Sequence, residues 1–466
     1  MHKLTINGLT VTAADNELLS DVLRRAGKPV ALPCGGCGTC GKCRVIVNGR
    51  EESACQYRVT ADAVVTVPET ETILSEIGAR ESHAMTEHMA LALDIGTTML
   101  ALALVSTDDG KIIKTVTAAN PQRAFGADVM SRIGYCRAHG VTALHAAVIS
   151  AVNDLIRELN APRVEMLYAA GNTTMLHLLF GADCSAMGTA PYTPAFLESQ
   201  TAPASRLGIT GAETVVSLPC AAAFVGADLT AGLGLVGLPP AGKCDLLIDL
   251  GTNAEIILFS RDEVVCTAAA AGPCFEGANI SCGMSSSAGA IFAYKYGCIQ
   301  TVGGAPPKGI CGTGLVDIIA ALSADGVIDA TGYMDCGEFE VAPDVTLTQD
   351  DVRQYQLAKA AVCAALLTLL QKRNVPFDRI DRLYIAGGFA AKINVANAVS
   401  TGLLPAALRE KCVSVGNSSL LGTAKYAFEK NDLSVFLDRM EYVDLAADPV
   451  FSDLFLENMT LGETEA

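Results

Sequence analysis

The chain has 466 residues, of which 50% are hydrophobic, and its 33 basic and 50 acidic residues give a formal net charge of −17 at pH 7. A chain of this length is expected to form roughly two to four domains. The negative charge disfavours nucleic acid and anionic membranes as partners. We find no signal-peptide pattern and no apolar run of about 18 residues, so we expect no transmembrane helix. The 17 cysteines are then expected to be reduced thiols in the cytoplasm.

A cysteine-rich loop, CGGCGTCGKC, runs from Cys34 to Cys43, and a further cysteine follows at Cys55. Thiolates at this density are typical of an iron–sulfur cluster or a zinc site. The spacing C-x5-C-x2-C of Cys34, Cys40 and Cys43, followed by the distant Cys55, is close to the plant-type [2Fe–2S] pattern. We therefore predict a [2Fe–2S] cluster on Cys34, Cys40, Cys43 and Cys55, and single-electron transfer as its chemistry.

Two other metal sites remain open for this loop. Cys34, Cys37, Cys40 and Cys43 form C-x2-C-x2-C-x2-C, which is similar to the [4Fe–4S] run but has a shorter last gap and leaves Cys55 unexplained. A four-cysteine zinc site prefers two separated pairs, whereas three of these thiols share one loop. Cys37 lies outside the four-ligand pattern and is either a free thiol beside the cluster or an exchangeable ligand.

The segments around the loop predict a small β-grasp domain over residues 1–68. Lys3–Thr12 reads as two strands joined at the hairpin dipeptide Asn7-Gly8. Asn16–Ala26 has helical spacing of leucines and valine, and Arg44–Asn48 and Val64–Val67 read as strands. This order resembles a [2Fe–2S] ferredoxin. Residues 69–89 are acidic and polar, which indicates a linker or one short helix.

Two similar strand–turn–strand segments begin the larger C-terminal part. Met89–Ser106 and Cys244–Phe259 each place an Asp-x-Gly-Thr turn between apolar runs. Glycine N–H groups and hydroxyls in such turns can bind phosphate oxygens, and the carboxylates can position Mg²⁺ and water. One turn alone is weak evidence, but the duplication is stronger. The candidate residues are Asp94, Gly96, Thr97 and Thr98 in the first turn, and Asp249, Gly251, Thr252 and Asn253 in the second.

These turns resemble the phosphate motifs of the ATPase superfamily that unites sugar kinases, heat-shock chaperones and actin. Its further motifs follow in order: a first connecting helix near Phe224–Gly234 with Asp228, an adenosine motif at Leu383–Phe389 with Gly387 and Gly388, and a second connecting helix at Asn417–Phe428. The resemblance implies an α/β protein: a ferredoxin-like domain followed by a duplicated ribonuclease-H-like ATPase domain. Its lobes would span residues 90–242 and 243–466, with ATP between them.

The combination resembles, over nearly the whole chain, the reductive activators of corrinoid-dependent methyltransferases. The segments that carry this resemblance are Asn120–Ile133, Gly171–His177, Ala271–Gly283, Gly309–Asp317 and Gln356–Ala360. Some members have a further domain between the cluster domain and the ATPase, whereas only about 20 linker residues stand here. Any role of that domain cannot be transferred to this chain.

The resemblance implies an enzyme that uses ATP to transfer one electron from a [2Fe–2S] cluster to a corrinoid protein, reducing inactive Co(II) to Co(I). It implies that Asp94 and Asp249 organise Mg²⁺ and the attacking water, with Glu276 as a weaker candidate for a polar contact to the nucleotide. The partners implied are a corrinoid protein and an upstream reduced ferredoxin or flavoprotein, and a homodimer is favoured.

Three other functions were weighed. A small-molecule kinase with an attached redox domain requires a phosphoacceptor pocket, to which no sequence feature points. A pure electron-transfer module would bind nucleotide with negligible hydrolysis. The activators of 2-hydroxyacyl-CoA dehydratases share the ATPase fold but lack a ferredoxin domain, against which Cys34–Cys55 argues. Gly237–Cys244 and Gly232–Gly237 imitate a P-loop and a Rossmann motif, but neither has the required strand–loop–helix context. His177 follows a family segment and is otherwise expected to be a satisfied core histidine.

Overall fold

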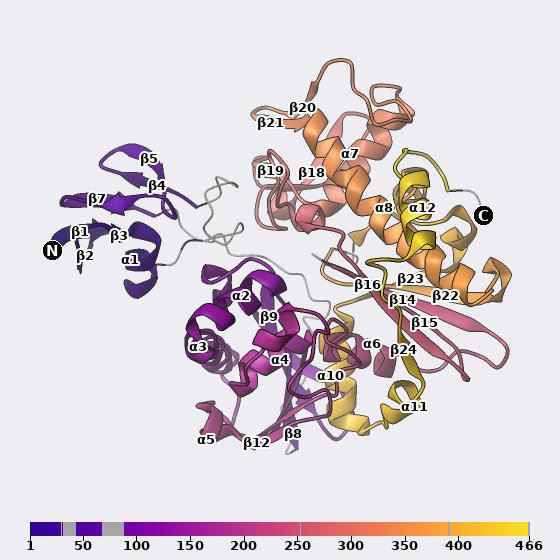
Figure 1. The fold of residues 1–466 in the computed structure, drawn as a ribbon, viewed down its shortest axis with the longest axis horizontal. Helices are drawn as coiled ribbons and strands as arrows, with labels where there is room; N and C mark the ends of the chain where they lie inside the picture. The colour runs from indigo at the N-terminus through magenta and orange to yellow at the C-terminus, as the bar shows by residue number, and fades with distance from the viewer. Residues whose placement is uncertain (29, 31–42, 68–87, 252, 390–391, 465–466) are drawn as a thin grey trace.

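The computed structural model describes residues 1–28, 30, 43–67, 88–251, 253–389 and 392–464. The chain forms a small N-terminal domain beside a larger body made of two lobes (Figure 1). Within the described ranges, no helix is long and apolar enough to cross a membrane. The longest of these helices, α8, spans Gln349–Lys372.

The N-terminal domain contains a sheet in the order β2-β1-β7-β4-β5 with helix α1, Leu19–Arg25, packed against it. The strands are β1 His2–Ile6, β2 Leu9–Ala13, β4 Arg44–Val47, β5 Arg50–Ser53 and β7 Ala63–Thr66. The predicted hairpin is confirmed, and its turn residues Asn7 and Gly8 have φ of 45° and 87°. The helix begins later than predicted because β3, Glu17–Leu18, pairs with β6, Arg58–Val59.

The first lobe of the body contains a sheet in the order β10-β9-β8-β11-β13-β12. Its strands are β8 Met89–Ile95, β9 Met99–Ser106, β10 Ile112–Ala119, β11 Val164–Gly171, β12 Thr201–Pro203 and β13 Ala212–Ser217. Its helices are η1 Pro121–Ala124, α2 Val129–His139, α3 Thr142–Leu159, α4 Thr173–Phe180, η2 Ser185–Gly188, α5 Ala204–Leu207 and α6 Ala227–Val236. The predicted linker lies outside the described residues as far as residue 87, and β8 already begins at Met89.

The second lobe repeats this arrangement in a sheet ordered β23-β22-β14-β15-β16-β24. Its strands are β14 Cys244–Leu250, β15 Ala254–Phe259, β16 Val264–Ala269, β22 Ile380–Ala386, β23 Cys412–Gly416 and β24 Met440–Tyr442. In both lobes an antiparallel meander is followed by a parallel strand, β11 beside β8 and β22 beside β14. The common topology confirms the duplication inferred from the two turns.

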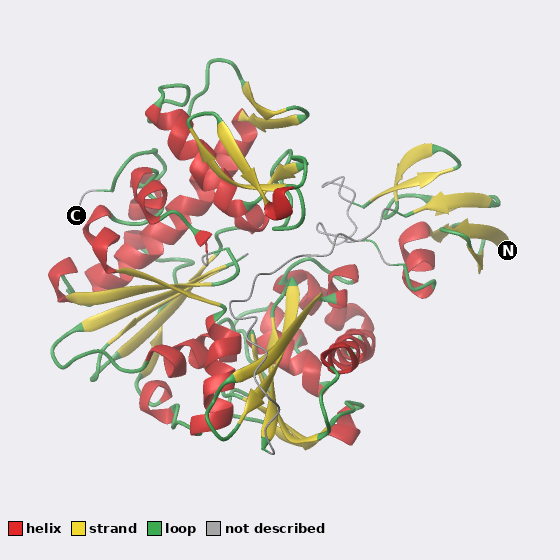
Figure 2. Cartoon of the chain, turned by 180° about the vertical axis from the view of Figure 1, so that it is seen from behind, coloured by secondary structure: helices red, strands yellow, loops and turns green. Residues whose placement is uncertain are grey.

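A subdomain is inserted between β16 and β22, and helices complete the second lobe (Figure 2). Its elements are η3 Pro273–Glu276, β17 Ala290–Lys295, β18 Cys298–Thr301, η4 Val302–Gly304, β19 Gly309–Ile310, α7 Gly312–Ala324, β20 Glu338–Ala342 and β21 Val345–Thr348. The other helices of this lobe are α8, η5 Phe377–Arg379, α9 Val395–Ser400, η7 Ala406–Lys411, α10 Ser418–Glu429, α11 Ser434–Leu437 and α12 Pro449–Glu457.

The two lobes share their interior through the crossing helices α6 and α10. Leu420 and Ala424 of α10 pack in one buried cluster with Ala92 and Ala103 of the first-lobe sheet. The helices approach closely at Gly422, where an added Cβ would lie 2.0 Å from the carbonyl oxygen of Ala231 in α6. A side chain there would push the helices apart, so this glycine is required by the crossing. The cleft between the lobes therefore rests on a continuous apolar base.

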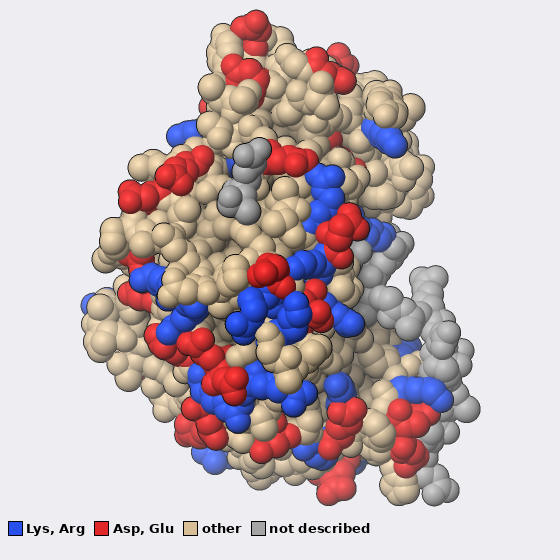
Figure 3. Space-filling view, turned by 90° about the vertical axis from the view of Figure 1, so that its right-hand side faces the viewer, with Lys and Arg blue, Asp and Glu red and all other residues tan. Residues whose placement is uncertain are grey.

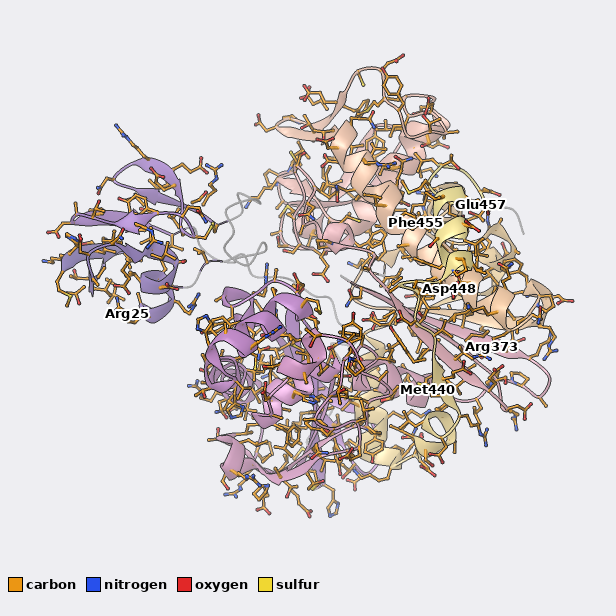
Figure 4. The ribbon with its side chains drawn as sticks, in the orientation of Figure 1. Arg25, Arg373, Met440, Asp448, Phe455 and Glu457 are labelled. Atoms are coloured by element: carbon orange, nitrogen blue, oxygen red, sulfur yellow. The ribbon has the colours of Figure 1, made fainter. Side chains whose placement is uncertain are left out.

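The C-terminal segment is attached to the second lobe by ion pairs at the end of α8. Lys372 lies 2.5 Å from Asp448, and Arg373 pairs with both Glu263 and Glu441. Figure 4 labels Arg373, Met440 and Asp448 on this side of the molecule. On the face drawn in Figure 3, Lys and Arg side chains alternate with Asp and Glu side chains. The net negative charge therefore does not form one continuous acidic surface on that face.

Candidate functional site

A cleft of about 1170 Å³ collects the predicted ATPase residues from both lobes. Its volume is sufficient for a nucleotide, since pockets for ligands of that size are typically about 300–1,000 Å³. Thr252 lies outside the described residues. The other predicted residues all line the cleft: Asp94, Gly96, Thr97, Thr98, Asp228, Asp249, Gly251, Asn253, Glu276, Gly387 and Gly388.

The two Asp-x-Gly-Thr turns open into this cleft at the ends of β8 and β14. In the first turn, a Cβ on Gly96 would lie 2.7 Å from the carbonyl oxygen of Met99, so only glycine fits this bend. In the second turn, the Gly251 amide donates to the carbonyl oxygen of Asn253 at 3.0 Å. Both turns thus place backbone groups at the cleft, and the first turn adds the hydroxyls of Thr97 and Thr98, as a site for phosphate oxygens requires.

Asp94 is held by two side chains from the beginning of α10. Its Oδ2 accepts from Nδ2 of Asn417 at 2.8 Å, and its Oδ1 accepts from Oγ of Ser419 at 2.7 Å. Burial raises the pKa of Asp94, and these two hydrogen bonds act in the opposite direction. Sequence reasoning placed a helix at Asn417 but missed both contacts. The sequence signal was the Asn-Ser-Ser run, because Asn and Ser are preferred residues at the N-terminus of a helix.

Further carboxylates surround Asp94. Burial raises the pKa of Asp228 to about 7, and burial together with the charges of Asp228, Asp94 and Glu276 raises the pKa of Asp249 to about 7. Glu255, directly opposite Asp249 in the β14–β15 pairing, has a pKa raised well above its ordinary value, chiefly by burial. Sequence reasoning missed Glu255, whose only signal was a charged residue within an apolar strand. These carboxylates raise one another's pKa values, but among the described residues no three acidic, histidine or cysteine side chains are arranged to hold a metal ion by themselves.

Glu276 joins the two lobes across the cleft. Oγ1 of Thr98, in the first phosphate turn, donates to its Oε2 at 2.6 Å. Glu276 is the last residue of η3, which leads into the subdomain of the second lobe. The carboxylate therefore contacts the first phosphate turn directly, and it is closer to the phosphate region than the sequence alone indicated.

The predicted adenosine motif lies at the end of β22. Gly387 has a φ of 98°, and an added Cβ would lie 2.7 Å from Oδ1 of Asp249. Only glycine accommodates both the backbone conformation and this approach. Beyond it, the rings of Phe389 and Phe275 are stacked with centroids 4.8 Å apart, and both residues line the cleft. The motif therefore offers a flat apolar wall next to the carboxylates.

The imitation motifs have structural roles. Gly232–Gly237 lies within and just after α6, and Gly237–Cys244 is the loop into β14, so neither begins a helix after a strand. Buried His177 has Nδ1 2.8 Å from the Thr173 carbonyl, accepts from the Ala195 amide, and stacks on Phe196. It is thus a satisfied core histidine. A second hollow of about 600 Å³ beside Asp351 contains none of the predicted site residues.

Two of the predicted cluster ligands lie together in the N-terminal domain. Sγ of Cys43 is 3.3 Å from Sγ of Cys55, and both residues are buried. Two thiolates bound to one tetrahedral metal ion at about 2.3 Å would be separated by about 3.8 Å, so this pair fits a shared cluster or metal. Gln56 Nε2 lies 3.6 Å from the Cys55 sulfur. Cys34, Cys37 and Cys40 lie outside the described residues.

Fold and site together define a ferredoxin-like domain followed by an actin-like ATPase. The family of 2Fe-2S iron-sulfur cluster binding domains matches residues 4–66. The family described as the RACo middle region matches residues 89–240, and that described as the C-terminal domain of RACo, the ASKHA domain, matches residues 243–466. The first match supports a [2Fe–2S] cluster over the [4Fe–4S] and zinc alternatives.

Relatives of the chain are named for one activity. "Corrinoid activation enzyme RamQ" of Eubacterium limosum is 31% identical over 424 residues, covering 80% of this chain and 70% of the relative. The "[Co(II) methylated amine-specific corrinoid protein] reductase" of Methanosarcina barkeri is 24% identical over 78% of this chain and 76% of its own length. The solved "Reductive activator for corrinoid,iron-sulfur protein" superposes with a TM-score of 0.73 and 28% identity, covering 99% of this chain and 98% of that one. The chain belongs to this family of corrinoid-protein reductive activators.

Proposed function

We propose that this chain is an ATP-dependent reductive activator that transfers one electron to the Co(II) form of a corrinoid protein and so restores Co(I). The observation that carries the proposal is the presence of a thiolate pair, Cys43 and Cys55, and a carboxylate-lined nucleotide cleft in one chain. The names of the relatives support the cobalt centre as the acceptor.

The N-terminal domain would hold its cluster through Cys34, Cys40, Cys43 and Cys55. When bound there, a [2Fe–2S] cluster supplies a single electron at a potential that depends on its surroundings. The chain contributes two buried thiols that already lie within reach of one metal ion, and a glutamine amide next to one sulfur. Hydrogen bonds to cluster sulfurs are among the groups that tune such a potential.

The cleft would bind ATP with Mg²⁺. Asp94 and Asp249 are the proposed groups that orient Mg²⁺ and the attacking water, and Asp228 supports them from α6. Carboxylates kept partly protonated by burial and mutual repulsion gain most from a divalent cation, which lets them ionise together. Phosphate oxygens would be held by Gly96, Thr97, Thr98, Gly251, Thr252 and Asn253, and adenosine would lie at Gly387 and Gly388.

Nucleotide binding would have to replace the bond between Thr98 and Glu276. The Thr98 hydroxyl donates a hydrogen bond to Glu276 in this structure, and a phosphate oxygen would compete as the acceptor of that bond. A ligand shifts a conformational equilibrium only through different affinities for the two states. Loss of the Thr98–Glu276 bond on nucleotide binding would give the two states different affinities for the nucleotide. The bond lies at the turn that is proposed to hold the phosphate oxygens.

Energy from ATP is needed because Co(II) reduction is unfavourable: each 59 mV of one-electron mismatch changes the equilibrium by about a factor of ten. The donor that refills the N-terminal domain must be a low-potential carrier, and a reduced ferredoxin or flavoprotein fits by chemical class. A homodimer and a cytoplasmic location remain predictions.

The test begins with protein purified without oxygen. Iron content and electron paramagnetic resonance spectra before and after dithionite should give about two irons per chain and one S = ½ signal, as a [2Fe–2S] cluster requires. The reduced protein should then convert a Co(II) corrinoid protein to Co(I) only with ATP. The Asp249→Asn variant should fail to reduce Co(II) even when ATP is present. Reduction at the same rate without ATP would exclude the proposal and favour a pure electron-transfer module. Phosphorylation of a small molecule without any corrinoid protein would exclude it and favour a small-molecule kinase.

A further inference from the structure

Helix α1 of the N-terminal domain contacts the first lobe through Arg24. Its Nη2 donates to the carbonyl oxygen of Ala124 at 3.1 Å, and its guanidinium carbon lies 4.8 Å from the ring centroid of Phe125. The guanidinium also lies 3.1 Å from Asp21 of its own helix. In Figure 1, α1 faces the part of the first lobe that contains α2. A charged hydrogen bond and a cation–π contact therefore join two different domains.

The segment that receives Arg24 is bonded directly to the first phosphate turn. At one end of the segment, the side-chain Nδ2 of Asn120 donates to the Gly96 carbonyl at 2.9 Å, and the backbone amide of Asn120 donates to the Thr98 carbonyl at 2.9 Å. At the other end, Nη2 of Arg132 donates to the Thr97 carbonyl at 2.5 Å. The carbonyls of three consecutive turn residues are thus bound by residues 120–132.

Residues 120–132, the relay segment, are held together and to the phosphate turn by buried hydrogen bonds. Asn120 is 1% exposed and Arg132 is 0% exposed, so neither can exchange its partners for water without opening the lobe. Arg132 also ties the segment together, since its Nε donates to the Gly126 carbonyl at 3.0 Å. An added Cβ on Gly126 would lie 2.3 Å from Oγ of Ser131, so the backbone next to Phe125 packs closely against the start of α2.

The relay segment also reaches the nucleotide cleft. Asp128 caps α2 through the Ser131 amide, and Asp128, Val129 and Met130 line the cleft. The relay segment lies within Asn120–Ile133, one of the segments that carry the resemblance to the family. It contacts the phosphate turn on one side and the cluster domain on the other, and packed elements of this kind can couple two sites when both sites bias their arrangement.

We propose that the relay segment couples nucleotide binding to the position of the cluster domain, and that Arg24 and Phe125 are the positioning residues of this coupling. The inference deepens the proposed function, on which it rests for its purpose, because docking places the Cys43 and Cys55 thiols of the N-terminal domain relative to the body. A nucleotide that shifts the Gly96–Thr98 turn would shift the carbonyl of Ala124 and the Phe125 ring, and thereby strengthen or weaken the docking. Coupling of this kind is reciprocal.

The experiment compares Arg24→Met with Arg25→Met in the full chain, purified without oxygen. Arg25, labelled in Figure 4, is the last residue of the same helix, and its guanidinium bonds to Thr12 and Glu17 of its own domain. Small-angle X-ray scattering measures docking through the radius of gyration, and calorimetry measures the affinity for a non-hydrolysable ATP analogue. The cluster spectrum of each variant checks that the domain is folded. Phe125→Leu, which removes the cation–π contact from the other side, is the second variant.

We expect Arg24→Met to enlarge the radius of gyration and to change the affinity for the analogue at least threefold, although Arg24 does not line the cleft. Phe125→Leu should change the affinity in the same direction, and Arg25→Met should behave as the parent. An unchanged radius overturns the docking, and an unchanged affinity overturns the coupling even if docking is lost. Neither measurement uses a corrinoid protein, so failure to reduce cobalt with the coupling intact would count against the proposed function alone.

Discussion

The hydroxyl of Thr98 donates to Oε2 of Glu276 at 2.6 Å, which makes a direct polar link between the first phosphate turn and the second lobe. The two residues are 178 positions apart in the sequence. If the cleft binds ATP as proposed, Glu276 would lie beside the phosphate oxygens held by this turn. Its role in binding can be separated from a role in hydrolysis by kinetics.

Replacing Glu276 with glutamine keeps an acceptor for Thr98 and removes the charge. If Glu276 orients or deprotonates the attacking water, kcat for ATP hydrolysis should fall by about 10²-fold or more, while the dissociation constant for the nucleotide changes little. Steady-state ATPase assays together with calorimetric binding of the analogue would measure both. Thr98→Ser, which keeps the hydroxyl, is the matched control. A raised KM with unchanged kcat would instead assign Glu276 to nucleotide binding only.

Asp228 should make the nucleotide-free protein less stable at neutral and alkaline pH. Its pKa is about 7 in the folded chain and about 3.9 unfolded, so the folded state holds a proton that the unfolded state releases. The free energy of unfolding therefore falls as the pH rises from about 4 to 7. Asp228→Asn keeps the acceptor for the Leu229 amide, which Oδ1 of Asp228 accepts at 2.9 Å, and removes the ionisation.

The variant should accordingly be more stable than the parent at pH 8 by an amount of order 2–4 kcal/mol, and this margin should shrink by about 1 kcal/mol at pH 6. The carboxylates facing Asp228, namely Asp94, Asp249 and Glu255, titrate with it and reduce the full value. Urea unfolding without nucleotide or Mg²⁺ measures the margin. Exposed Asp335→Asn is the control, and a variant less stable than the parent at pH 8 would contradict the expected repulsion.

Buried thiols should make the body unstable in alkali. Burial raises the pKa of Cys220, Cys266 and Cys274 to about 12 each, whereas an unfolded thiol has a pKa near 8.5. Between these values the folded state binds more protons, so stability is lost as the pH rises. Each thiol contributes up to about 1.4 kcal/mol per pH unit, which gives about 4 kcal/mol per unit for the three.

Anaerobic urea unfolding in reductant at pH 8, 9 and 10 would test this slope. Cys266→Ala should reduce the contribution of these three thiols by about a third, even if it lowers stability at every pH. The control is Cys298→Ala, because Cys298 is exposed and meets water in both states. A slope that is the same in the parent and in Cys266→Ala would show that buried thiols do not govern the alkaline limit.

The local features of the site could be read from the sequence. The two phosphate turns were predictable because each consists of adjacent residues between apolar strands long enough to identify, as in β8 and β9. The Asn7-Gly8 hairpin was predictable for the same reason. The start of α1 was not, because Glu17 and Leu18 pair with β6 some 40 residues later.

The features that depend on tertiary contacts were missed. Asn417 and Ser419 reach Asp94 across 323 and 325 positions, and the packing of α10 against β8 brings them together. Glu255 looked like an ordinary charged residue until the β14–β15 register placed it opposite Asp249. A single sequence can mark such side chains as unusual, but it does not identify their partners, because residue type and spacing describe near neighbours only.

The cluster assignment makes the last prediction. Cys55→Ala should lower the iron content to near zero, because its sulfur forms a close pair with that of Cys43 and its loss leaves only three of the four predicted ligands. Cys37→Ala should keep about two irons per chain and the S = ½ signal, because Cys37 is outside the predicted ligand set. Iron analysis and electron paramagnetic resonance of anaerobic samples measure both. Loss of iron in Cys37→Ala with retention in Cys55→Ala would move the cluster to the four evenly spaced cysteines, and the Cys43–Cys55 pair would then be a packing contact.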